Sequence, residues 1–477
     1  GSGAIYNTFT HAGPSATASN AFFQINGDGS GTFHAVTTNN SNIDYEVLDN
    51  GDTIQELVHQ DVHNGVDKAK VETQLSKAGV TNISSPDFDD VYNTNAYVDS
   101  KTVDDKYNVF ANGGIVDIKG PHSVFSNSYK HVAGVHGQGV MMNGGTINLN
   151  GTDKNRAIFS VTEDTDDTDM AGTQYYYNTG TLNVNSSESA VLATSPQKKR
   201  PVAFINRNSI NLNNSSSAGI LIGLANGIDT GINLHLNFSD AKSTRAQTQI
   251  SATNYKSDDM PNSGNNSLYV NKLDSNGIID RTTAVSKSHP LVVNGSSSAG
   301  IYTKTTNSFI NGQFAVNLSP TSSSSAGIYS SSKMDLQGHY IKIEGSNNVG
   351  VYPVDNSTYF LGNGSIELTG GNNNTGIVIN RNATGVPKVA NGYVYSASEM
   401  VLNGGKKNMA IYAEGSGANT NDVVVKSIET GTDTQDNIFI FADNGAKVRV
   451  GFKTTTGGNT TVAGGLKVKA NMSSNPT

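Results

Sequence analysis

Two glutamates in the second half of the chain have a spacing that acid–base chemistry could use. Glu344 and Glu367 lie 23 residues apart, which is also the length of the shortest repeat in the chain. A repeat of that length stacks equivalent residues about 5 Å apart on neighbouring strands. Retaining glycosidases hold their paired carboxylates at about that separation. Both glutamates alternate with aliphatic residues that would face a core, so the pattern favours two solvated, outward-facing carboxylates.

Two other groups of residues have spacings that suggest metal ligands. The acidic stretch 163–169 spaces its carboxylates as calcium loops do, but it lacks the glycine and the closing glutamate of an EF-hand. His59 and His63 are four residues apart, as in a two-histidine zinc site, but no acidic general base lies in the required place. We therefore predict a solvated loop tip and surface histidines, with no metal ligand and no cofactor.

Three consecutive tyrosines are the only residues that we single out as ligand-binding. The chain has no tryptophan, so Tyr175, Tyr176 and Tyr177 are the aromatic side chains that could form a platform in a lectin-like site. The alternative is a loop whose tyrosines pack on the wall of the fold, and the pattern favours that alternative.

The elements that must position these residues belong to a repeat. The phrase Ser-Ala-Gly-Ile-Tyr occurs at 298–302 and at 325–329, and Ser-Ala-Gly-Ile-Leu occurs at 217–221. A polar turn precedes each copy, and an alternating strand such as 365–369 precedes the turn. Aligning the copies predicts a column of core residues: Val135, Ile158, Val191, Ile220, Leu268, Ile301, Ile328, Val351, Ile377, Ile411 and Ile440.

The repeat predicts an all-β chain folded as a parallel β-helix solenoid. One coil buries few aliphatic residues, so each isoleucine needs the isoleucine of the coil above and below it. We expect the glycine before the isoleucine to allow a tight corner. The asparagine and serine residues of the turns are expected to stack as side-chain ladders.

Departures from the repeat predict the domain organisation. Residues 1–43 are the start of the β-helix or an N-terminal cap, and residues 44–108 carry helical spacing and form an inserted subdomain with short helices. The β-helix follows at 109–450, with a loop insert at 238–264. C-terminal strands and a tail complete the chain at 451–477.

Composition excludes several classes of partner. The net charge is −8 and the only dense basic run is 198–200, so nucleic-acid binding is not expected. No apolar run reaches the length of a membrane-spanning helix. The absence of cysteine fits an exported bacterial protein that stays unfolded in transit, and the opening Gly-Ser resembles a cloning scar, which indicates a mature fragment.

With its Asn-rich turns, Thr-Ile-Asn-Leu-Asn-like strands and Gly-Ile-Tyr phrases over roughly 109–450, the chain resembles the passenger regions of large autotransporter adhesins, particularly those of fusobacteria. The resemblance implies a right-handed β-helix on the bacterial cell surface, anchored in the outer membrane by a C-terminal barrel outside this fragment. It also implies a role in attachment through projecting loops.

The expected partners are a host-cell glycan or receptor protein, or the surface of another bacterium, and we expect a monomer that is not an enzyme. The alternatives are a β-helical polysaccharide lyase or glycosidase, and a secreted toxin of the passenger type.

Overall fold

The structure is a computed structural model, and it is all-β. It describes residues 4–7, 10–13, 23–25, 31–33, 107–112, 115–118, 125–129, 138–163, 174–196, 201–223, 230, 266–274, 277–278, 287, 289–303, 308–354, 357–379, 392–415, 421–431, 437–443 and 445–468. These residues contain strands and turns and no helix. The segment 44–108, in which short helices are expected, lies outside the described residues except for its last two. These are Tyr107 and Asn108, which begin a strand.

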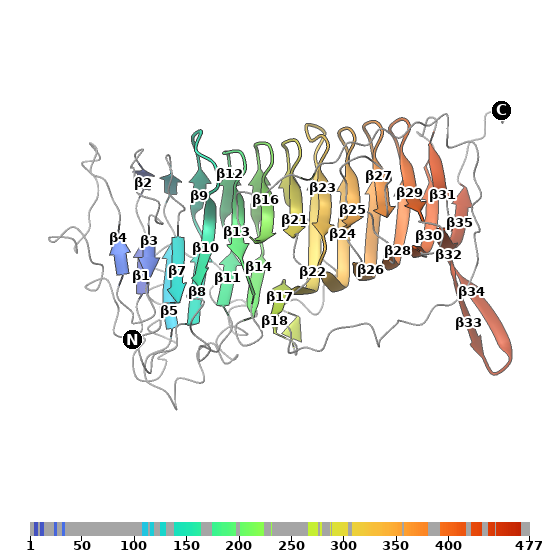
Figure 1. Cartoon of the computed structure of the whole chain (residues 1–477), viewed down its shortest axis with the longest axis horizontal. Helices are drawn as coiled ribbons and strands as arrows, with labels where there is room; N and C mark the ends of the chain where they lie inside the picture. The colour runs from blue at the N-terminus through green and yellow to red at the C-terminus, as the bar shows by residue number, and fades with distance from the viewer. Residues whose placement is uncertain are drawn as a thin grey trace. The chain divides into compact units, whose positions relative to one another are not determined.

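The chain divides into two compact units. Unit 1 comprises 1–228 and 263–282, and unit 2 comprises 229–262 and 283–477. Within each unit the strands stack in parallel rows, an arrangement consistent with the expected solenoid (Figure 1). We call one passage of the chain through these rows a coil.

Unit 1 has three rows of parallel strands, two in one sheet and one in another. The first row is β1 (Ala4–Asn7), β5 (Tyr107–Asn112), β8 (Gln138–Asn143), β11 (Gln174–Asn178), β14 (Val202–Asn206) and β17 (Asn266–Val270). The second row is β2 (Thr10–Gly13), β6 (Ile115–Ile118), β9 (Thr146–Leu149), β12 (Thr181–Val184) and β15 (Ser209–Leu212). The third row is β3 (Phe23–Ile25), β7 (Phe125–Tyr129), β10 (Ala157–Glu163), β13 (Ala190–Thr194) and β16 (Ala218–Ile222). Antiparallel pairing adds β4 (Gly31–Phe33) to β3, and joins β18 (Lys272–Asp274) to β19 (Gly277–Ile278).

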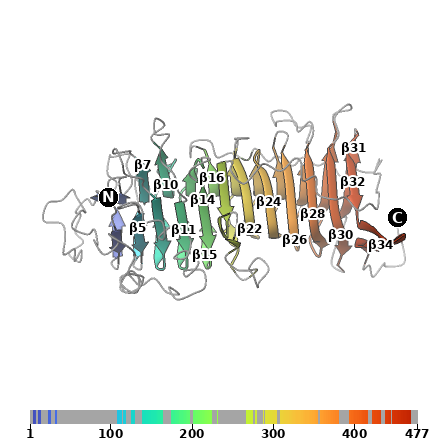
Figure 2. The same ribbon diagram turned by 90° about the horizontal axis from the view of Figure 1, so that it is seen from below.

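Unit 2 has one row of mostly long strands and a facing row of shorter ones. The first row is β20 (Leu291–Val293), β22 (Ser308–Leu318), β24 (Lys333–Ile343), β26 (Thr358–Leu368), β28 (Tyr393–Leu402) and β30 (Asp422–Thr430), then β32 (Lys447–Val450) and β35 (Gly465–Val468), which both pair with β30. The long strands β22 to β30 lie side by side in Figure 2. The facing row is β21 (Ala299–Thr303), β23 (Ala326–Ser330), β25 (Val349–Pro353), β27 (Thr375–Ile379), β29 (Met409–Glu414) and β31 (Ile438–Asp443). An antiparallel hairpin, β33 (Phe452–Thr456) and β34 (Asn459–Ala463), interrupts the last coil.

The predicted core column is confirmed throughout unit 2. Consecutive strands of the facing row pair at the expected residues, all of which are at most 6% exposed. The column is Ile301, Ile328, Val351, Ile377, Ile411 and Ile440. Each side chain of this column therefore has an apolar partner in the neighbouring coil, and the contact between them excludes water along the column.

In unit 1 the predicted column is wrong at three described positions. Ile220 pairs with Leu192, and Leu192 pairs with Phe159, each one residue after the expected Val191 and Ile158. Leu268 lies on β17 and pairs with Val202 of the first row, so it belongs to another face of the coil. An alternating apolar pattern fixes which side of a strand is buried but not the row to which that strand belongs. Val135 lies outside the described residues.

The glycine of the repeated phrase does not make the corner, contrary to the expectation. Gly300 lies inside β21 and does not have a positive φ. A Cβ on Gly300 would lie 2.6 Å from the carbonyl oxygen of Gly327 and 2.8 Å from the ring of Phe314. Glycine is therefore needed because neighbouring coils and the opposite sheet approach the backbone closely.

The corner is made three residues before the glycine of the phrase, or before Ala410 in the copy at 408–412, by a residue in the left-handed region. Non-glycine residues occupy this position with φ between 49° and 56°: Ser297, Ser324, Asn347, Asn373 and Lys407. Unit 1 has a corresponding series at Asn155, Glu188 and Ser216. Asparagine tolerates this region better than most residues, which explains part of the asparagine content of the turns.

A buried polar residue follows each of these corners in unit 2 and links its coil to the next. Each backbone N–H donates to the side-chain oxygen of the following residue in the series, at 2.8–3.1 Å. The series, which we call the turn ladder, is Ser298, Ser325, Asn348, Asn374, Asn408 and Asn437. This confirms the predicted stacking of serine and asparagine in the turns.

Unit 1 carries ladders built from asparagine amides, again as expected. Asn178 is fully buried, accepts from the amide of Asn143 at 2.9 Å and donates to Asn206 at 2.9 Å. Two further ladders follow the second row and its turn, each joined by amide–amide bonds of 2.8–2.9 Å. Their members are Asn148, Asn183 and Asn211, and Asn150, Asn185 and Asn213.

Aromatic side chains also stack from coil to coil. Tyr329 lies between Tyr302 and Tyr352, with ring centroids 5.1 and 5.2 Å apart and interplanar angles of 7° and 17°. All three rings are at most 5% exposed. The tyrosine of the repeated phrase is therefore part of the scaffold.

The long strands of unit 2 bend where their pairing register shifts. The residues between the two paired stretches number three in β26 (362–364), two in β28 (397–398) and one in β30 (Lys426). In the last coil the bend contains residues 451–464, because the β33–β34 hairpin is inserted there. Pairing resumes beyond each bend, so the bend can differ in length from coil to coil while the strands stay paired on both sides of it.

A histidine is buried beside these bends. His339 on β24 is 1% exposed, and its Nε2 lies 3.5 Å from the hydroxyl of Ser396. Its Nδ1 has no hydrogen-bond partner among the described residues. Burial lowers the pKa of His339 from 6.5 to about 4, so the side chain is neutral in the folded chain at pH 7.

We predict that Asn374→Ala lowers the free energy of unfolding by about 2–4 kcal/mol, because it leaves several buried groups without a partner. Asn374 accepts from the N–H of Asn348 and donates to the carbonyls of Gly345 and Gly370. Chemical denaturation measures the loss. Asn374→Ser is the matched control, since Ser325 holds the equivalent place in another coil, and it should cost less. Equal stability of Asn374→Ala and the parent chain would contradict the ladder's role.

We also predict that the chain loses stability in mild acid through His339. The unfolded chain takes up this proton near pH 6.5 and the folded chain only near pH 4. The contribution is therefore complete above pH 6.5 and declines as the pH falls towards 4, by on the order of 3 kcal/mol in total. The free energy of unfolding, measured by chemical denaturation at several pH values, should change less between pH 6.5 and 4 in His339→Leu than in the parent chain. The control variant His289→Leu, which replaces an exposed residue, should show the same change as the parent chain. An unchanged slope in His339→Leu would refute the assignment.

Candidate functional site

The outward surface of β24 and β26 gathers the polar residues that carry the clearest candidate site. Along β24, Tyr340 and Lys342 alternate with buried residues, and Glu344 follows at the end of the strand. The parallel register places Tyr340 opposite Ser365, and Lys342 opposite Glu367. We call this surface, from Tyr340 and Ser365 to Glu344 and Thr369, the β24–β26 face.

The expected stacking of the two glutamates is wrong. Glu367 lies opposite Lys342, not Glu344. Ile343 is paired with Leu368, so Glu344 is level with Thr369, 25 residues further along the chain. The Thr369 hydroxyl donates to Oε1 of Glu344 at 3.1 Å. The two carboxylates that would suggest a glycosidase are therefore not neighbours, because a lysine lies opposite Glu367.

Each glutamate of the β24–β26 face has a lysine partner. Nζ of Lys342 lies 3.4 Å from Oε1 of Glu344, and Nζ of Lys287 lies 3.6 Å from Oε1 of Glu367. The Glu367 carboxylate also accepts from Tyr340 at 3.2 Å and from Ser365 at 3.1 Å. Partly exposed ion pairs of this kind contribute little to the stability of the fold.

Tyr340 is the aromatic residue of this face. Burial raises its pKa to about 12, and the Glu367 carboxylate beside its hydroxyl adds to the shift. Nζ of Lys287 lies over the ring, 4.8 Å from the centroid. Tyr340 therefore stays protonated at physiological pH and acts as a hydrogen-bond donor.

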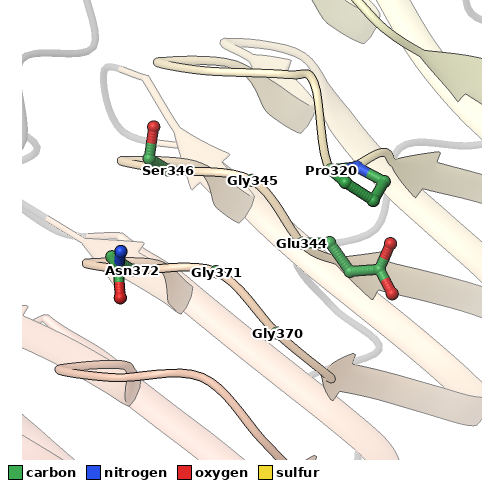
Figure 3. A pocket seen from close by; sticks show the side chains of 7 residues that line it. All are labelled: Pro320, Glu344, Gly345, Ser346, Gly370, Gly371 and Asn372. Atoms are coloured by element: carbon green, nitrogen blue, oxygen red, sulfur yellow. The ribbon is translucent and has the colours of Figure 1, made fainter.

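A pocket of about 410 Å³ opens where this face meets the turns (Figure 3). Three successive turns contribute its lining, which is Pro320, Glu344, Gly345, Ser346, Gly370, Gly371 and Asn372. The sequence analysis did not identify this pocket. Its signal is the recurrence of a glycine-containing turn ending in asparagines, at 344–348 and again at 369–374.

The three tyrosines predicted to bind a ligand lie on β11. Tyr176 is fully buried and Tyr177 is 3% exposed. The ring of Tyr176 lies 5.7 Å from that of Phe159, centroid to centroid, in a tilted contact. The side chain of Tyr175 lies outside the described residues. A ligand role for the three stays a prediction, and the burial of two of them corresponds to the packing alternative.

Other candidates from the sequence lie mostly outside the described residues. This applies to His59, His63, the basic run 198–200 and the insert at 238–264; of the acidic stretch only Glu163 is described, at the end of β10. Among the residues that the structure describes, no group of three or more acidic or histidine side chains could hold a metal ion.

Comparisons with known proteins do not add to this picture. No protein-family model matches the chain, and no curated protein and no solved structure shows significant similarity to it. Within the described ranges, no helix is long and apolar enough to cross a membrane.

We predict that Glu367→Lys destabilises unit 2 by about 0.5–1 kcal/mol, because it places like charges opposite each other at Lys342 and beside Lys287. Urea denaturation at low and at high salt measures the effect, which salt should reduce. Glu367→Gln is the control that removes the charge without reversing it, and it should cost less. A salt-independent loss would indicate packing damage in place of charge repulsion.

Proposed function

We propose that this chain is the passenger region of a surface-displayed adhesin, folded as a right-handed parallel β-helix and similar to the large autotransporter adhesins of fusobacteria. The observation that carries the proposal is the regular stacking of coils, with aliphatic, tyrosine and asparagine columns continuing through successive coils. Such stacking builds a stiff support from short repeats and leaves the outward residues and the loops free to differ from coil to coil.

The proposed mechanism is passive attachment. The scaffold holds outward polar faces and turn tips in fixed positions, and these contact a glycan or protein receptor on a host cell or on another bacterium. The β24–β26 face supports this view, because its charges are compensated in pairs and its side chains are fixed by hydrogen bonds. Fixed polar groups favour recognition, since little side-chain freedom is lost on binding.

We prefer binding to sugar cleavage for a specific reason. A retaining glycosidase needs two carboxylates about 5 Å apart across the scissile bond, and the only pair that suggested one, Glu344 and Glu367, is not stacked. Each carboxylate is instead paired with a lysine. This supports the adhesin over the glycosidase alternative at this face.

We predict that the fluorescently labelled 477-residue chain binds saturably to epithelial cells or to bacterial cells, as measured by flow cytometry. Deletion variants locate the binding segments: removal of 44–106, which spares β5, and removal of 238–264, each bridged by a short Gly-Ser linker. At least one deletion should reduce binding while the β-sheet circular dichroism spectrum is kept. Absence of saturable binding to both kinds of cell would refute the adhesin proposal, and full binding by both deletions would refute a role for these segments.

A further inference from the structure

We propose that the pocket at the turns of β24 and β26 binds a neutral sugar unit, such as one hexose residue of a receptor glycan. This inference rests on the proposed adhesin function and names the ligand class for one site. It is carried by three observations on the pocket: a rigid frame, polar groups that the fold does not use, and a glycine that the fold does not need.

The frame of the pocket is fixed by hydrogen bonds between successive turns. The backbone of Ser346 forms bridges with Ser323 and Asn372. The N–H of Asn372 donates to the carbonyl of Gly345 at 2.9 Å, and the N–H of Ser346 donates to Ser322 at 3.2 Å. Behind these turns lies the buried turn ladder. The lining residues are therefore held in place before a ligand arrives, which lowers the entropic cost of binding.

The polar groups of the pocket are largely uncommitted. Oε1 of Glu344 is held by Lys342 and Thr369, whereas Oε2 has no partner among the described residues. The side chains of Ser346 and Asn372 likewise make no hydrogen bond with the described part of the chain. Glu344, Ser346 and Asn372 are all among the residues that line the pocket, and their side chains keep free donor or acceptor capacity; Figure 3 shows the carboxylate near Pro320 and the other two side chains at the turn tips.

This set of groups matches a hydroxylated, uncharged ligand. A carboxylate oxygen accepts from sugar hydroxyls, and an amide both donates and accepts. The negative charge of Glu344 disfavours anionic ligands, since the charge is only partly compensated by Lys342 at 3.4 Å. The ring of Pro320 adds an apolar surface for the C–H face of a sugar. A volume of about 410 Å³ lies at the small end of the range for ligand pockets.

The space around Gly370 is the observation that most directly indicates a ligand. It is not in the left-handed region, and a Cβ on it would meet only Cγ of Glu344, at 3.8 Å. Gly345 and Gly371 differ, because both have positive φ and a Cβ on either would collide with backbone at 2.2 and 1.7 Å. The fold therefore requires glycine at 345 and 371 but not at 370, where the absence of a side chain keeps the pocket open.

The test is saturation-transfer-difference NMR of the full chain with the methyl glycosides of glucose, galactose, mannose and N-acetylglucosamine, and with an anionic methyl sialoside. We expect a signal from at least one neutral glycoside, with a Kd of about 1 mM, and none from the sialoside. Gly370→Leu should abolish the signal. Glu344→Gln and Asn372→Ala should each weaken binding about tenfold. Lys406→Ala is the matched control: Lys406 occupies the same column one coil further on, outside the pocket, and its replacement should leave binding unchanged.

The outcomes separate the pocket from the adhesin proposal. A wild-type chain that gives no signal with any neutral glycoside overturns the pocket, as does binding of unchanged affinity in Gly370→Leu and Asn372→Ala. Thermal melts should show Gly370→Leu as stable as wild type; if it fails to fold, the exposed Asn372→Ala variant decides. Cell attachment that Gly370→Leu retains overturns the pocket as the receptor site while leaving the adhesin intact. Sugar binding that Gly370→Leu abolishes, in a chain that attaches to no cell, keeps the pocket and refutes the adhesin.

Discussion

The turn ladder is the interaction on which the rest of unit 2 depends. A left-handed corner exposes backbone N–H and C=O groups in the interior, where an unpaired group is costly. A serine or asparagine side chain in the next coil accepts each of these N–H groups, and the amides of Asn348 and Asn374 donate to carbonyls of their own and the neighbouring turns. Corner geometry, coil spacing and core alignment follow from this one bond, because it lets the chain reverse direction at the same place in every coil.

Two other features take their form from that constraint. Coils held at a constant spacing bring the backbones so close that the phrase glycines have no room for a Cβ. The same spacing places tyrosine rings at stacking distance, and sets the outward Lys342 opposite Glu367 in the neighbouring strand. The face that could recognise a ligand therefore depends on buried amides that never contact the ligand.

The sequence was sufficient where the repeated phrase recurs closely. From Ile301 onwards, the phrase recurs in every coil, with glycine before the aliphatic residue in four of the six copies, so the core column could be predicted residue by residue. It was insufficient where the turns differ in length. Ile328 and Val351, in the facing row, are 23 residues apart, but Ile343 and Leu368, which pair between β24 and β26, are 25 residues apart. The 23-residue step therefore does not apply on this side of the coil, and Glu344 is not level with Glu367. The pocket escaped prediction for the same reason, since it joins residues of three turns whose relative alignment is set only by pairing.

The bend in the long strands has an implication for how such a chain can change. The bend contains one to three residues in β26, β28 and β30, and a whole hairpin in the last coil, while the strands remain paired on both sides of it. Genetic insertions at this edge thus leave the neighbouring coils intact, whereas insertions at the ladder-bearing edge would displace a buried amide. The molecule can therefore gain new surface elements at the bend without a change in its core packing. The bend is also a suitable site at which to insert a foreign peptide.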